Sequence, residues 1–83
     1  MQQIFILANV EGLHFRPASR IIEICRQASC SVQIIKGDQS ANPLSMMSLL
    51  KLGVRCGEPV TVIAEGQQAQ EIVTAIGQIL ESS

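Results

Sequence analysis

Hydrophobic residues recur with two different periods along this chain, and these periods divide it into predicted short strands and helices. Residues 2–8 (QQIFILA) form an apolar run typical of a strand, and a turn is predicted at residues 9–12. From about residue 16 to residue 28, apolar side chains recur every three or four positions, at Ala18, Ile21, Ile22, Cys25 and Ala28. That spacing places them on one stripe and predicts an amphipathic helix.

The middle of the chain has the pattern of a β-hairpin. Residues 31–36 are rich in Val and Ile, and the pair Gly37-Asp38 is typical of a tight turn between antiparallel strands. A short second strand is predicted over residues 39–42. It ends at Pro43, because proline has no ladder donor and restricts the residue before it.

The second half of the chain continues the alternation of helices and strands. A short helix is predicted from Ser45 to Leu52, with Ser45 as its N-cap and Gly53 as a left-handed C-cap. The remaining predicted elements are a loop over residues 54–58, a strand opened by Pro59 over 60–65 and closed by Gly66, and a helix over 67–80.

The predicted order β-α-β-β-α-β-α indicates an α+β fold. We expect a four-stranded antiparallel sheet with three helices on one face. No linker or repeat divides the 83 residues, so residues 1–83 are predicted to form one domain.

Composition argues against several classes of function. The chain has six basic and seven acidic residues, no Trp or Tyr and no basic stripe, which argues against nucleic-acid binding. No apolar run approaches the roughly 20 residues that span a bilayer. The first residues, Met1-Gln2-Gln3-Ile4, lack the basic region of a secretory signal, so a cytoplasmic location is expected.

The cysteines carry no recognisable chemistry. Cys25, Cys30 and Cys56 are odd in number and show no Cys-x-x-Cys spacing, and the chain has a single histidine. We therefore expect no metal, no cofactor and no disulfide, and three reduced thiols in core or half-buried positions.

The single histidine, His14, lies where a helix is predicted to begin. A helix N-terminus presents unpaired N–H groups and a partial positive charge, and so favours anions. Arg16 adds a cation whose fork of donors fits phosphate oxygens. Pro17 is expected at the first helical position, where its missing N–H is not needed. A nucleophilic imidazole beside an anion site predicts a phosphoryl group carried on the ring. A surface or capping histidine is the plain alternative.

The short helix from Ser45 to Leu52 is apolar nearly all round. Because so small a domain can hardly bury such a helix completely, we expect some of Met46, Met47 and Leu50 to form an outward docking patch. Ser45 is either a simple N-cap or a phosphorylation switch beside that patch.

These two regions resemble the two signatures of the HPr family, the histidine-containing phosphocarriers of the bacterial sugar phosphotransferase system. The residues that carry the resemblance are Gly12–Ala18 (GLHFRPA) and Ser45–Gly53 (SMMSLLKLG), and the likeness extends over essentially the whole chain. It implies an open-faced β-sandwich and a cytoplasmic phosphocarrier rather than a stand-alone enzyme.

The resemblance also assigns roles and partners. His14 would accept a phosphoryl group from enzyme I and pass it to enzyme IIA proteins, with Arg16 stabilising the phosphate. Phe15 and Pro17 would join the patch of Met46, Met47 and Leu50 in binding these partners. Ser45 matches the serine that a regulatory serine kinase, with its phosphorylase, modifies in some lineages. A monomer is expected.

Three residues depart from the family pattern. Phe15 is bulkier than usual, Glu11 places a carboxylate near the imidazole, and Leu44 stands before Ser45 where a basic or polar residue is common. A carboxylate there favours the imidazolium and disfavours an added phosphate. Two alternatives stay open: a regulatory module acting through Ser45 and the Met46–Leu50 patch without carrier activity, and a domain that binds an anionic metabolite in a pocket at Arg16.

Overall fold

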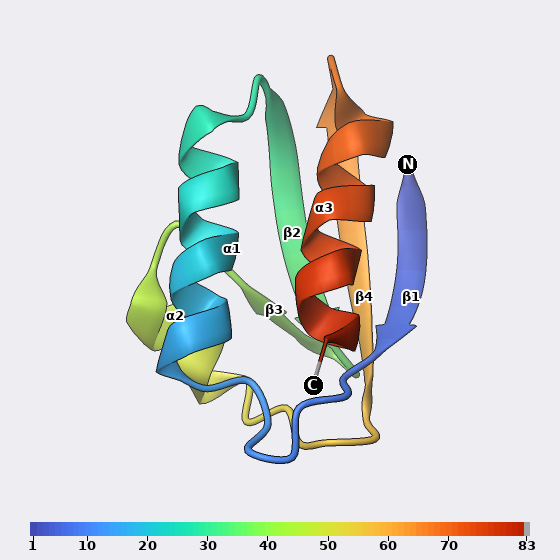
Figure 1. The fold of residues 1–83 in the computed structure, drawn as a ribbon. Helices are drawn as coiled ribbons and strands as arrows, with labels where there is room; N and C mark the ends of the chain where they lie inside the picture. Colours follow the sequence, from blue (N-terminus) through green and yellow to red (C-terminus); the bar gives the residue numbers. More distant parts are fainter. Residues whose placement is uncertain (83) are drawn as a thin grey trace.

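The computed structural model describes residues 1–82 and has four strands and three helices in the predicted order (Figure 1). Ser83, the last residue of the predicted domain, lies outside the described residues. The elements are β1 Gln2–Ile6, α1 Phe15–Gln27, β2 Cys30–Lys36, β3 Gln39–Ala41, α2 Met46–Lys51, β4 Pro59–Gly66 and α3 Ala69–Glu81.

The strands form one antiparallel sheet in the order β1-β4-β2-β3, as predicted. Strand β4 lies in the interior of the sheet, where Val62 pairs with Gln3 on one side and with Ile34 on the other. The last strand of the chain therefore joins the first strand to the hairpin, and it holds the two halves of the sequence in one sheet.

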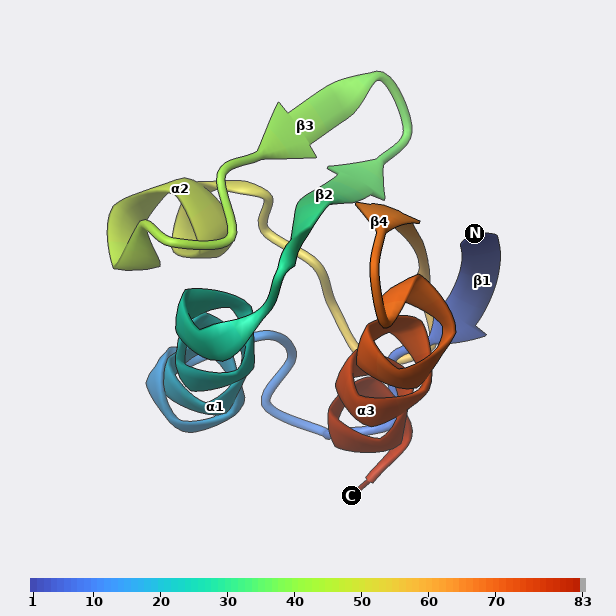
Figure 2. The ribbon, with the colours of Figure 1, turned by 90° about the horizontal axis from the view of Figure 1, so that it is seen from above.

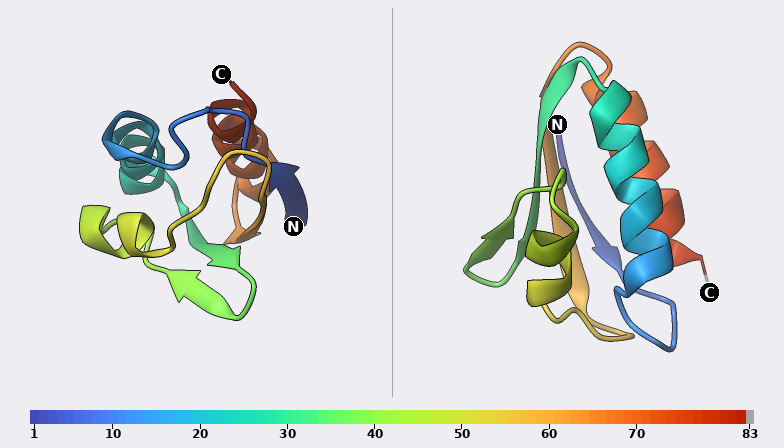
Figure 3. Two further views of the ribbon diagram at one scale, coloured as in Figure 1. Left: turned by 90° about the horizontal axis from the view of Figure 1, so that it is seen from below. Right: turned by 90° about the vertical axis from the view of Figure 1, so that its left-hand side faces the viewer.

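The helices cover one face of this sheet. Helices α1 and α3 lie side by side across it, and α2 packs against α1 and β3 (Figure 2). Seen from the side, the opposite face carries no helix (Figure 3). The predicted open-faced sandwich is confirmed.

The core lies between the sheet and the helices. Alternate residues of β4 point into it, so that Val60, Val62 and Ala64 are fully buried, and Phe5 joins them from β1. The helices contribute their apolar stripes, including Ile21 from α1 and Ile76 from α3. Within residues 1–82, no helix combines the length and the apolar character needed to cross a membrane.

Element boundaries differ from the predicted ones where tertiary contacts compete with the local pattern. Strand β1 ends at Ile6, not at residue 8. Beyond it the N–H groups of Leu7 and Ala8 donate to the carbonyls of Glu58 and Leu80, which lie outside the ladder. Helix α3 begins at Ala69, not at residue 67, because Gln68 has a left-handed backbone with φ 64°.

Candidate functional site

The connection between β1 and α1 is a tight turn that positions His14. The side-chain oxygen of Asn9 accepts a hydrogen bond from the backbone N–H of Glu11 at 2.8 Å. The carbonyl oxygen of Asn9 accepts a second one from the N–H of Gly12 at 2.9 Å. An Asn side chain that bonds the backbone two residues ahead stabilises such a turn. The turn therefore has a defined shape before the helix begins.

The loop between α2 and β4 fastens this turn in place. The N–H of Leu13 donates to the carbonyl of Val54 at 3.0 Å, and the N–H of Gly57 donates to the carbonyl of Leu7 at 2.7 Å. Gly12 has a φ of +75°, and a Cβ atom at this position would lie 2.6 Å from the oxygen of Val54. Only glycine fits both the conformation and the space.

Glu58 organises the loop that holds the turn. Its carboxylate accepts a hydrogen bond from the N–H of Arg55 at 2.7 Å and lies 3.3 Å from the ammonium group of Lys36. The hydrogen bond from Arg55, with the Lys36 contact second, lowers the pKa of Glu58 below its ordinary value. Sequence reasoning missed Glu58, because a single acidic residue before a proline has no local signature.

We predict that Glu58→Gln loosens this loop in a pH-dependent way. A lowered pKa means that the ionised form is favoured in the folded state, so its contribution is present above the unfolded pKa and is lost as the pH falls through the folded one. Thermal unfolding of the wild type and the variant should therefore differ at pH 7 and converge in acid. A Tm difference that stays constant into acid would contradict this role.

His14 occupies the N-cap position of α1 with an extended backbone, and its side chain makes no capping hydrogen bond. The side chain is 32% exposed, yet its Nε2 atom is buried and has no hydrogen-bond partner within residues 1–82. The nearest charged group is the Glu11 carboxylate, with Oε1 3.4 Å from Nε2. Because Nε2 is enclosed, the exposed part of the ring lies elsewhere.

The start of α1 forms the expected group of free donors, with one correction. Pro17 is the third helical residue and not the first, because the helix begins at Phe15. The position suits proline, since the first N–H groups of a helix have no partner in the preceding turn. The first helical hydrogen bond runs from Ala18 to the carbonyl of His14. Within residues 1–82 the N–H groups of Phe15 and Arg16 have no acceptor.

Two side chains of this first turn face solvent. Phe15 is 68% exposed and Arg16 is exposed as well. The Arg16 guanidinium has no hydrogen-bond or ion-pair partner in the part of the chain that the structure describes. Pro17, by contrast, is buried and packs into the fold. Within residues 1–82, the first turn of α1, which directly follows His14, thus carries an unpaired cation and two N–H groups without acceptors.

The second predicted region lies next to the first, because α2 packs against α1 (Figure 1). Ser45 is the N-cap of α2, and its hydroxyl accepts a hydrogen bond from the N–H of Ser48 at 3.2 Å. The three side chains expected to offer an outward patch differ in exposure. Met47 is exposed, whereas Met46 and Leu50 are half-buried and pack against the core.

The cysteines differ partly from their predicted places. Cys25 is buried and Cys30 half-buried, but Cys56 is exposed, because it lies in the loop that fastens the turn. Burial, with the neighbouring Cys30 adding to the effect, raises the pKa of the Cys25 thiol to about 11. A thiol that stays protonated is a poor nucleophile, so Cys25 has a packing role.

The surroundings of the turn form no enclosed ligand site. A small open hollow of about 240 Å³ beside it is lined by residues of the turn and the loop, among them Glu11, Val54 and Arg55, but not by His14 or Arg16. Within residues 1–82, no three His, Cys, Asp or Glu side chains gather closely enough to hold a metal ion. The arrangement suits chemistry at an exposed ring.

Known proteins share both the sequence and the fold. Residues 1–82 match the family described as the PTS HPr component phosphorylation site. A multiphosphoryl transfer protein of Xanthomonas campestris is 38% identical over 76 residues, which cover 92% of this chain but 9% of that protein. The phosphocarrier protein HPr of Haloferax volcanii is 31% identical over 99% of this chain and 94% of its own length.

Solved structures agree with the sequence comparisons. An HPr crystal structure from Thermoanaerobacter tengcongensis superposes with a TM-score of 0.90 and 29% identity, over 99% of this chain and 92% of that one. This fold carries a partly exposed imidazole at the start of α1, and the family match spans residues 1–82. The chain therefore belongs to the HPr family of the phosphotransferase system.

Proposed function

We propose that this protein is a phosphocarrier that accepts a phosphoryl group on His14 from enzyme I and passes it to enzyme IIA proteins. The observation that carries the proposal is the position of His14. Its partly exposed imidazole stands at the N-terminus of α1, whose first turn carries two N–H groups and a guanidinium that have no partner within residues 1–82. Such donors favour an anion where the helix begins.

The proposed acceptor atom is Nδ1. The two ring nitrogens differ, because Nε2 is buried while the side chain as a whole keeps a third of its surface. A phosphoryl donor needs open approach to the attacking lone pair, and this requirement favours Nδ1. The phosphoryl oxygens would then rest against the N–H groups of Phe15 and Arg16 and the Arg16 side chain. Positioning and electrostatic stabilisation of this kind are the main means of catalysing phosphoryl transfer.

We expect this site to bind a phosphoryl group only moderately, which would suit a carrier that must release it. One cation and one helix end face solvent, and no lid covers them within residues 1–82. We further propose that Phe15 and Met47, exposed on neighbouring helices, form the apolar contacts for both partners. A cytoplasmic location and a monomeric state remain predictions.

The experiment that tests this function is phosphorylation by enzyme I and phosphoenolpyruvate. We expect the chain to gain one phosphate that is labile in acid and stable in base, and to lose it when an enzyme IIA protein is added. No mass gain, with an enzyme I that phosphorylates a known HPr in parallel, would reject the proposal.

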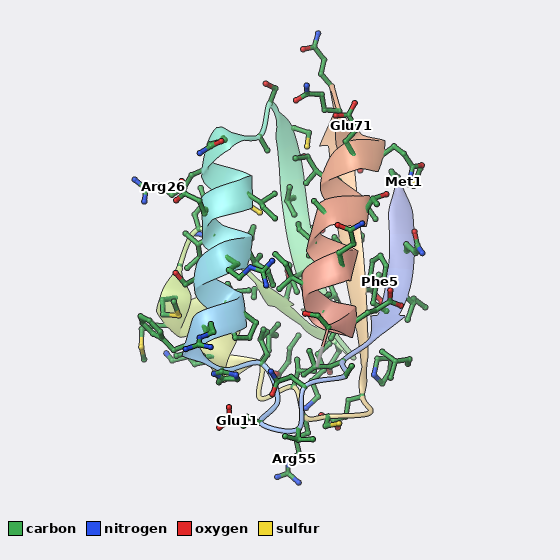
Figure 4. The ribbon with its side chains drawn as sticks, in the orientation of Figure 1. Met1, Phe5, Glu11, Arg26, Arg55 and Glu71 are labelled. Atoms are coloured by element: carbon green, nitrogen blue, oxygen red, sulfur yellow. The ribbon has the colours of Figure 1, made fainter. Side chains whose placement is uncertain are left out.

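Arg16→Ala is predicted to slow phosphoryl transfer without unfolding the domain. The exposed guanidinium holds no other group of residues 1–82, so its loss removes charge stabilisation alone. We expect a fall of about a hundredfold in the transfer rate, the lower end of the loss caused by removing one donor at an oxyanion site. Arg26→Ala, at the far end of α1 (Figure 4), is the matched control and should leave the rate unchanged. Equal rates for the two variants would remove Arg16 from the mechanism.

The regulatory alternative gives a different outcome in the same assays. A module that acts through Ser45 alone would take up no phosphate from enzyme I, whereas a serine kinase would modify it. The Ser45 hydroxyl already accepts a hydrogen bond as the cap of α2, so the structure explains this serine without a modification.

A further inference from the structure

The enclosed nitrogen of His14 lacks a partner. Buried polar atoms are almost always hydrogen-bonded, and an exception calls for a physical explanation. Nε2 is buried without an acceptor within residues 1–82, and the Glu11 carboxylate oxygen stands 3.4 Å away, slightly beyond a good hydrogen bond. The Glu11 side chain is 72% exposed, so it can move the remaining few tenths of an ångström without disturbing the core.

The backbone aims Glu11 at this nitrogen. The Asn9 side chain holds the Glu11 N–H, and Gly12 turns the chain in a conformation that the Val54 carbonyl permits only to glycine. Residues 11 and 14 are thereby brought to the same side of the turn. Glu11 and Arg55 both extend from the end of the molecule opposite to Glu71 (Figure 4).

We propose that Glu11 is a positioning residue that keeps the ring proton of His14 on Nε2. The inference deepens the proposed function. An imidazole with its proton on Nε2 has its lone pair on Nδ1, the nitrogen proposed above as the acceptor, ready to attack. A carboxylate that accepts from one ring nitrogen fixes the tautomer and the orientation of the ring, as it does in other histidine sites.

The same contact keeps the Nε2 proton on the phosphorylated ring, so that the ring departs as neutral imidazole and not as the much poorer leaving group imidazolate. During uptake, the Nδ1 lone pair forms the N–P bond while the bond from phosphorus to the donor breaks and its electron pair returns to the donor. The Nε2 proton does not move, so the phosphorylated ring is a cation facing the carboxylate. Onward transfer breaks the N–P bond and returns the pair to Nδ1. The Glu11 carboxylate thus faces the Nε2 proton and not the phosphoryl group on Nδ1. Its charge therefore need not repel the phosphoryl oxygens.

Nitrogen-15 NMR of the unphosphorylated protein tests the proposal without any partner enzyme. At about pH 8.5, where an imidazole is ordinarily neutral, we expect one tautomer with the proton on Nε2 in the wild type. Glu11→Ala should give a mixture of both tautomers. Glu11→Gln should restore the single tautomer, because its amide oxygen still accepts a hydrogen bond. Equal tautomer ratios in the wild type and Glu11→Ala, or no restoration by Gln, would overturn the inference.

The rate of onward phosphoryl transfer is a second test of Glu11, with Glu71→Ala as the control variant. Glu11→Ala should pass its phosphoryl group on about threefold to tenfold more slowly, the loss expected for one ordinary hydrogen bond. Glu71→Ala removes a carboxylate at the far end and should transfer at the wild-type rate. An unchanged rate in Glu11→Ala would also count against the inference. A chain with the predicted tautomers that takes up no phosphate would contradict the proposed function alone.

Discussion

His14→Ala is expected to take up no phosphate from enzyme I while remaining as stable as the wild type. The loss should be complete, because His14 is the only histidine in the sequence and the nucleophile itself disappears. The fold should tolerate the change, since the imidazole makes no capping hydrogen bond and its buried Nε2 atom has no partner within residues 1–82. Intact mass and thermal unfolding measure the two effects.

Intact mass and thermal unfolding together distinguish the loss of the acceptor from the loss of the fold. If His14→Ala unfolds at the wild-type temperature and still gains the same acid-labile phosphate, the acceptor lies elsewhere and the assignment is wrong. Glu71→Gln, a polar substitution at the opposite end of the molecule (Figure 4), should take up phosphate like the wild type.

Gly12→Ala is expected to damage both stability and transfer. Alanine in a left-handed conformation costs about 1–2 kcal/mol, and its Cβ would also press against the backbone oxygen of Val54. Relieving that overlap should cost about 1–3 kcal/mol more, as overpacking does. The turn that carries His14 must then shift, and a displacement near 1 Å lowers transfer by about a hundredfold.

Gly37→Ala is the matched control for this prediction. Gly37 has a similar φ of +61°, but nothing lies within 4 Å of the position its Cβ would take. The stability of Gly37→Ala should therefore fall only by the cost of the left-handed backbone, and its transfer rate should equal that of the wild type. Denaturant unfolding and transfer kinetics of the two variants check this. Equal losses of stability, or normal transfer by Gly12→Ala, would show that the contact with Val54 does not hold the site.

The sequence pattern predicted the fold well because local and tertiary preferences agree in most elements. Three residues of the stripe predicted for α1, Ala18, Ile21 and Cys25, are buried. Ser45 caps α2 and Gly53 has a left-handed backbone, as the pattern predicted. The predicted boundaries are wrong mainly at the ends of elements. The apolar pattern extends the first strand through Leu7, yet the N–H of Leu7 donates to the carbonyl of Glu58 in a distant loop.

The site itself was predictable only in part. The motif around His14 is local in sequence, so its place at the start of a helix could be anticipated. The loop that fixes it could not, because the bonds from Leu13 to Val54 and from Arg55 to Glu58 depend on how remote segments meet. The sequence also could not say which of Met46, Met47 and Leu50 faces outward, because that depends on how α2 packs; Met47 is exposed, while Met46 and Leu50 pack against the core.

The central claim is that phosphorus bonds to Nδ1 of His14 at the start of α1. Nitrogen-15 and phosphorus-31 NMR of the labelled protein, after treatment with enzyme I and phosphoenolpyruvate, measures this directly. The account predicts a phosphorus–nitrogen coupling at Nδ1 and a proton on Nε2. A phosphate on Nε2, or on any residue other than His14, would contradict it.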